Sequence, residues 1–171
     1  MNSVAVTSSG RFLAKLAVAA TGAFFALTGY QAAAAGAAGD GLEGFWNGNG
    51  VVTYASGTKE KLRCRVQYIL GSAERLQQAL RCASDSYKFQ INASFVQNSG
   101  TVSGHWDELS MNISGSITGT AVAGHINGNL HGPGFLASVS VETDGDRQSV
   151  TIAAADQDIR QVAIEVRKSK R

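Results

Sequence analysis

Apolar and polar residues alternate along most of the chain from residue 44 onward. A period of two is typical of β-strands that bury one face, whereas amphipathic helices repeat near 3.6 residues. Between residues 59 and 70, Leu62, Cys64, Val66 and Tyr68 share one parity, and basic or polar residues occupy the other. Turn-forming residues separate the segments. The pattern predicts an all-β domain: an antiparallel meander of about 8–10 short strands, closed as a small barrel or folded as a sandwich.

Glycines occupy the apolar parity in the middle of the chain. Ile113, Gly115, Ile117 and Gly119 share one face of a predicted strand, and a similar pattern returns from residue 126 to residue 132. Glycine inside a strand often marks a bend or a close approach of two backbones. We therefore expect a strongly curved sheet. The weak four-residue repeat leaves a β-solenoid as an alternative.

The two cysteines of the chain, Cys64 and Cys82, both lie in the predicted β domain. An even pair of cysteines indicates a disulfide where a chain is exported, as the N-terminal segment of this one predicts. Pairing them directly across two antiparallel strands centres the hairpin on Ala73, where the turn residues already lie. The same register places Arg65 opposite Arg81. We expect one structural disulfide that closes this hairpin.

The N-terminal segment has the three parts of a secretory signal. Arg11 and Lys15 precede an apolar run over residues 16–27, and small residues at 32–35 offer cleavage frames. We expect residues 1–35 to be a cleaved signal peptide, 36–43 a flexible mature N-terminus, 44–167 a single β domain and 168–171 a basic tail. A retained membrane anchor is the alternative. Cleavage predicts a periplasmic or secreted protein with no membrane span in the mature chain.

Loss of that segment changes the charge balance. The whole chain has 15 Lys+Arg and 13 Asp+Glu, and the predicted signal removes Arg11 and Lys15 but no acid. The mature chain is then formally neutral, which argues against nucleic acid as a partner. Its charges are segregated, however: residues 59–88 are predominantly basic and residues 101–165 predominantly acidic.

Four cations of the basic segment form a candidate anion-binding site. Lys61, Arg63 and Arg65 share the polar parity of one strand, and Arg81 lies opposite Arg65. Like charges directly opposite each other destabilise a sheet unless something anionic lies between them. The predicted partners are an anionic glycolipid, a polysaccharide or an acidic protein. Protection of an edge strand, with Lys61 paired to Asp85, is the alternative.

Aromatic residues on the apolar parity define a second candidate site, for a small ligand inside the domain. Its residues are Trp46, Tyr54, Tyr68 and Trp106. Aromatic side chains at such positions also serve simply to fill a core. No set of residues combines a nucleophile, a base and an orienting group, and none has the spacing of a metal or cofactor site. We therefore predict no enzymatic activity, no cofactor and no metal; oligomeric state is left open.

Two resemblances add to this interpretation. Gly44-Phe45-Trp46 before a β-meander resembles the G-x-W opening of lipocalins and avidins, although the chain lacks a lipocalin's length and C-terminal helix and an avidin's several tryptophans. The segments 62–65, 81–87, 102–106 and 132–135 make the chain similar to small exported proteins of rhizobia-type alphaproteobacteria. That likeness implies an exported β domain and carries no activity with it.

These observations favour a non-enzymatic exported protein that binds an anionic envelope component or a small ligand. The alternative is a protein-interaction module, such as an inhibitor of an envelope hydrolase, that presents a loop such as residues 98–100.

Overall fold

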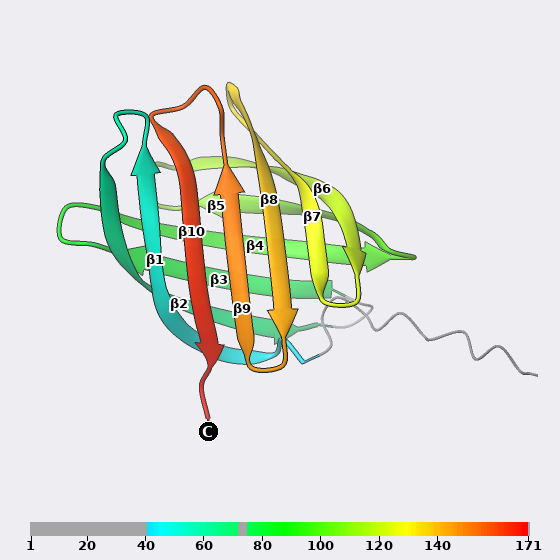
Figure 1. Ribbon diagram of the computed structural model, residues 1–171. Coiled ribbons are helices and arrows are strands. Elements are labelled where there is room, and N and C mark those ends of the chain that lie inside the picture. Colours follow the sequence, from blue (N-terminus) through cyan, green and yellow to red (C-terminus); the bar gives the residue numbers. More distant parts are fainter. Residues whose placement is uncertain (1–40, 72–74, 171) are drawn as a thin grey trace, which may run out of the picture. The chain divides into compact units, whose positions relative to one another are not determined.

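The structure, a computed structural model, describes residues 41–71 and 75–170. Residues 1–40, which include the expected signal peptide, and residues 72–74 and 171 lie outside the described part of the chain. The compact unit formed by residues 34–171 contains ten strands (Figure 1). They are β1 (Gly44–Tyr54), β2 (Lys59–Leu70), β3 (Arg75–Ala83), β4 (Lys88–Asn98), β5 (Thr101–Glu108), β6 (Ile113–Val122), β7 (His125–Gly132), β8 (Phe135–Asp144), β9 (Arg147–Ala153) and β10 (Ile159–Lys168).

The ten strands form a closed antiparallel barrel. Each strand pairs with its neighbours in the sequence, and β1 closes the sheet by pairing with β10. In Figure 1, β1, β10, β9 and β8 form one wall, in front of β2 to β5. Closure satisfies the backbone groups that an open sheet would leave unpaired at its two edges. The predicted all-β meander is confirmed. Of the alternatives, the fold is the closed barrel, and not the sandwich or the solenoid.

The hairpin of β2 and β3 has the predicted register. Cys64 pairs with Cys82 and Arg65 pairs with Arg81. The two cysteines form a disulfide, with their Cα atoms 4.2 Å apart. Both cysteines are buried, so the disulfide belongs to the inner wall of the barrel. The predicted disulfide is confirmed.

Glycines allow the curved wall to bend sharply. Gly119 of β6 lies directly opposite Gly128 of β7. A Cβ atom added at Gly119 would come within 2.3 Å of the Asn127 carbonyl oxygen, and one added at Gly48 within 1.9 Å of the Glu165 carbonyl oxygen. The backbones of neighbouring strands approach closely at these points, as the glycine pattern predicted.

One end of the barrel is closed by the segment that enters β1. Leu42 is buried, and its carbonyl oxygen accepts a hydrogen bond of 2.8 Å from the indole nitrogen of the fully buried Trp46. Lys168, at the end of β10, donates a hydrogen bond to the Gly41 carbonyl oxygen and lies 5.8 Å from the centre of the Trp46 ring. We call this closed end the base. The C-terminal ends of β2, β4, β6 and β8 lie at the base too, because successive strands of a meander run in opposite directions.

Within the described residues, no helix is both long enough and apolar enough to cross a membrane.

Candidate functional site

The barrel encloses a cavity of about 270 Å³, which we call the barrel cavity. Its volume lies just below the range of about 300–1,000 Å³ for ligand pockets. Most of the side chains that line it are aliphatic or aromatic; the polar exceptions are Tyr68, Gln78, Tyr87, Gln97, Glu108 and Gln148. Among the described lining residues there is no lysine, arginine or histidine.

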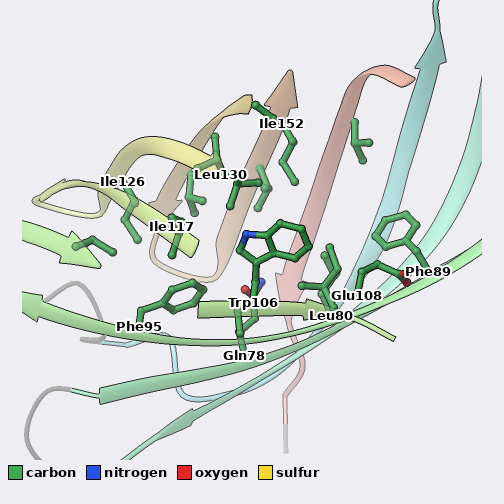
Figure 2. Close-up of a pocket in the computed structure, with 18 of the residues that line it drawn as sticks. Gln78, Leu80, Phe89, Phe95, Trp106, Glu108, Ile117, Ile126, Leu130 and Ile152 are labelled. Carbon is green, nitrogen blue, oxygen red and sulfur yellow. The ribbon is translucent and has the colours of Figure 1, made fainter. Parts of the chain in front are cut away.

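One row of inward-facing residues crosses the cavity wall from strand to strand. Tyr68 of β2 pairs with Gln78 of β3, which pairs with Ala93 of β4, which pairs with Trp106 of β5. Figure 2 shows the Gln78 amide next to the Trp106 ring at the centre of the cavity, with Phe95 on one side and Glu108 and Phe89 on the other. The row thus places a hydrogen-bonding amide between a phenol and an indole. Ala93, the smallest member of the row, lines the cavity between Gln78 and Trp106.

A buried hydrogen-bond network lies toward the base. The Tyr68 hydroxyl donates to Gln148 Oε1 over 2.7 Å, and Gln148 Nε2 donates to Thr143 Oγ1 over 3.1 Å. Gln78 Nε2 donates a longer, weaker hydrogen bond of 3.4 Å to the Tyr68 hydroxyl. Burial raises the pKa of Tyr68 above its ordinary value, because the phenolate would be desolvated. Tyr68 is therefore a neutral hydroxyl with a fixed donor direction.

Glu108, at the end of β5, is the one buried carboxylate among the described residues. It accepts hydrogen bonds from the backbone N–H groups of Gln90, Ser110 and Met111. Burial raises the pKa of Glu108, but these N–H donors outweigh burial and hold the pKa below its ordinary value. The carboxylate is thus fully engaged in shaping the loop between β5 and β6. Glu108 thereby fixes this loop at the end of the barrel opposite the base, which we call the mouth.

Tyr87 and Met111 lie at the mouth with Glu108. Tyr87 is half-buried, and Met111 is 55% exposed although it contacts the cavity. Burial raises the pKa of Tyr87, and the nearby negative charge of Glu108 raises it further. The mouth thus combines two polar side chains, Tyr87 and Glu108, with the apolar Met111.

Trp106 has a fixed position in the cavity wall. Its ring covers Gly115 of β6, where an added Cβ would come within 2.6 Å of the ring. Its indole nitrogen donates a hydrogen bond of 3.2 Å to the Ser116 carbonyl oxygen, and its ring centre lies 5.9 Å from that of Phe135. Gly115, the Ser116 carbonyl oxygen and the Phe135 ring together orient the indole. Trp106 therefore forms a fixed part of the cavity wall.

The structure places the four predicted interior aromatic residues at different depths. Tyr68 and Trp106 line the barrel cavity. Trp46 packs edge-on against Tyr68 below the cavity, with ring centres 6.3 Å apart, as part of the base. Tyr54 lies at the opposite end of β1, where its hydroxyl donates a hydrogen bond of 3.0 Å to the Glu60 carboxylate.

Sequence reasoning missed the interior polar residues Gln78, Gln148 and Glu108. A signal for them was present, because Gln78 lies on the same parity as Leu76 and Leu80, Gln148 on that of Val150, and Glu108 on that of Trp106. A polar residue on an apolar parity indicates a buried hydrogen-bonding group.

The predicted anion-binding residues Lys61, Arg63, Arg65 and Arg81 lie together on the outside of β2 and β3, and all are exposed. None of them lies within ion-pair distance of an acid among the described residues; the contact of this kind that the described part of the chain contains joins the His105 ring to Asp107 over 3.1 Å. The alternative pairing of Lys61 with Asp85 is therefore not formed in this structure.

Comparison with known proteins finds similarity at the level of the fold. No family model matches the chain, and no curated protein matches its sequence. Rv2717c from M. tuberculosis is similar in structure, with a TM-score of 0.61 and 16% identity over 78% of this chain and 98% of that one. The S-type phycobiliprotein lyase CPES from Guillardia theta has a TM-score of 0.54 and 10% identity over 77% of this chain and 91% of that one. At these identities the likeness shows the fold alone, a closed antiparallel β-barrel.

Proposed function

We propose that this protein binds one small, uncharged, mainly apolar molecule inside the barrel. The observation that carries the proposal is the barrel cavity itself: apolar walls, an open volume of about 270 Å³, and a few oriented polar groups. Protein interiors ordinarily pack with few voids larger than a water molecule. An apolar space of this size inside a closed barrel is typical of a ligand site. The lipocalin-like fold supports small-ligand binding in general.

The lining argues for an uncharged ligand. A carboxylate or sulfonate inside the cavity would meet no cation among the described lining residues, and it would approach the negative Glu108 at the mouth. An unpaired buried charge is strongly unfavourable. A hydroxyl or carbonyl group, in contrast, would meet the Gln78 amide and the Tyr68 hydroxyl. The favoured class is a neutral apolar molecule with a single hydrogen-bonding group.

Fluorescence titration with the neutral dye Nile red tests this proposal. Decan-1-ol should displace the dye more effectively than decanoate, because only the alcohol enters without an unpaired charge. Trp106→Phe should abolish ligand-induced changes in tryptophan emission, since Trp46 lies below the cavity. Equal displacement by the alcohol and the acid would contradict the neutral-ligand class.

A cavity-filling variant supplies the decisive control. Ala93→Leu adds three carbon atoms beside Gln78 and Trp106 and should weaken dye binding at least tenfold (about 1.4 kcal/mol). Ala163→Leu, on the outer surface of β10, makes the same chemical change outside the cavity and should leave binding unchanged. Dye binding that is insensitive to Ala93→Leu, in a variant that still folds, would refute binding inside the barrel.

A further inference from the structure

The outer surface of β1 to β4 carries basic residues and no acid. On these strands the outward positions are the odd residues of 45–53, 59–69 and 75–83 and the even residues of 88–98. We call this surface the basic face. Its cations are Lys59, Lys61, Arg63, Arg65, Arg75, Arg81 and Lys88, and the remaining outward positions are amides, hydroxyls, alanine or apolar residues.

The cross-strand register concentrates the positive charge. Arg65 of β2 lies opposite Arg81 of β3. On the other side of β2, Arg65 pairs with Asn47 of β1, which in turn pairs with Arg167 of β10. In the next row, Arg63 is followed by Ala83 and then by Lys88. Neighbouring strands lie about 4.8 Å apart, so these cations repel one another in the free protein. From Arg63 toward β1 and β10, the first acid in the cross-strand row is Glu165 of β10, which lies two strands away.

Exposed apolar side chains border the basic face near the base of the barrel. Phe45 is 60% exposed, Ile69 and Leu70 are each 46% exposed, and Val96 is 37% exposed. Phe45 pairs with Gln67, two residues from Ile69, and Val96 pairs with Arg75. Apolar residues are thus interspersed with cations at this end of the face. We call these four residues the apolar edge.

We propose that the basic face docks on a membrane surface that contains anionic lipids. Binding at such a surface combines electrostatic attraction of Lys and Arg to headgroups with burial of apolar side chains at the acyl boundary. The basic face offers both groups on one wall of the barrel. A soluble acidic polysaccharide would pair with the arginines but would offer nothing apolar to the apolar edge. This docking is separate from ligand binding, because the cations of the basic face point away from the barrel cavity and no residue of the apolar edge lines it.

The orientation on the membrane follows from the strand geometry. Outward residues repeat every 6–7 Å along a strand, so Lys61 lies about 27 Å from Ile69. The headgroup layer is only about 5–8 Å thick on each side of a bilayer. The cations of β2 therefore reach headgroups together only when β2 lies along the membrane plane, with the apolar edge tilted inward.

Co-sedimentation with large unilamellar vesicles tests this docking. The protein should bind vesicles of phosphatidylcholine with about one third phosphatidylglycerol, and not pure phosphatidylcholine, and binding should fall as salt shortens the Debye length below about 10 Å. Arg65→Gln/Arg81→Gln should weaken binding about 25-fold. Arg147→Gln/Arg160→Gln makes an equal change of charge on β9 and β10, outside the basic face, and should weaken vesicle binding less than Arg65→Gln/Arg81→Gln does.

A variant and a matched control test the contribution of the apolar edge to vesicle binding. Phe45→Ser should weaken vesicle binding about tenfold, because the ring no longer enters the interface. Leu136→Ser removes a side chain that is 57% exposed on β8, away from the basic face, and should have no effect. All variants carry the same N-terminus, so any contribution of residues 1–40 is common to them, and circular dichroism verifies folding.

Three results would overturn the proposal. One is an equal loss of vesicle binding in the two double arginine variants, which would mean that net charge alone is responsible. Another is equal binding to neutral and anionic vesicles. The third is binding to the soluble polyanion dextran sulfate without binding to anionic vesicles, which would favour a soluble acidic polymer as the partner. Nile red binding in the barrel cavity is measured separately, so failure here leaves the proposed ligand function untouched.

Discussion

Substitution of Tyr68 by phenylalanine tests whether the hydrogen-bond network at the base stabilises the barrel. Tyr68 is 4% exposed and Gln148 is 2% exposed, so water cannot readily replace the lost hydroxyl. The substitution preserves the ring, and with it the edge-on contact to Trp46. It removes the donor that lies 2.7 Å from Gln148 Oε1.

The expected loss of unfolding free energy depends on the buried Gln148 acceptor that the substitution leaves without a donor. A buried neutral hydrogen bond contributes a net of about 0.5–1.5 kcal/mol, and a buried acceptor left without a donor costs about 1–3 kcal/mol. The two estimates describe the loss of the same donor and are therefore not added together. We expect Tyr68→Phe to lower the free energy of unfolding by about 2 kcal/mol. Replacing both partners, as in Tyr68→Phe/Gln148→Met, removes the stranded acceptor and should cost less than the sum of the single substitutions, with a coupling of about 1 kcal/mol.

Urea unfolding at neutral pH, followed by circular dichroism, measures these differences. Tyr87→Phe is the control, since the half-buried Tyr87 lies at the mouth, and it should change the free energy of unfolding by less than about 0.5 kcal/mol. Alkaline pH adds a second measurement. Burial raises the pKa of Tyr68 above 10.0, so its contribution to stability is present below pH 10 and is lost as pH rises beyond it. Wild type should therefore lose more stability than Tyr68→Phe above pH 10.

A change of less than about 0.5 kcal/mol in Tyr68→Phe would refute the reasoning, as would strictly additive effects in the double variant. Either result would mean that the network adjusts around the missing hydroxyl.

Further predictions concern the wall and the loops of the barrel. Replacing Cys64 and Cys82 by alanine should lower the free energy of unfolding by about 3 kcal/mol, as measured by urea unfolding, because the disulfide closes an 18-residue loop. Hydrogen bonds from serine and tyrosine hydroxyls lower the pKa of Glu60 to about 2. Its contribution to stability is therefore present above pH 4.5 and is lost as pH falls toward 2, so acid unfolding of Glu60→Gln should be less steep in this window than that of wild type. Gly119→Ala should destabilise the barrel more than a surface substitution does, with a lower thermal midpoint, because the added Cβ would meet the Asn127 carbonyl oxygen at 2.3 Å; an unchanged midpoint would argue against close packing of β6 on β7.

The local architecture was predictable from the sequence because its causes are local. Strand parity follows from the period of two, and the inward or outward side of Cys64, Arg65 and Trp106 follows from parity. The pairing of β2 with β3 was predictable because a short turn determines hairpin register, and the disulfide agreed with that register. These inferences required no knowledge of residues distant in the chain.

Only the tertiary structure decided how the ends meet and what the closed wall encloses. Pairing of Trp46 with Lys168 joins segments at opposite ends of the domain, and no local pattern specifies it. Parity says that Trp46 and Trp106 both face inward, but depth along the barrel axis depends on the tilt and stagger of all ten strands. Closure therefore makes Trp46 part of the base and Trp106 part of the cavity wall, and it leaves between the strands an open apolar volume that no alternation of residues can reveal.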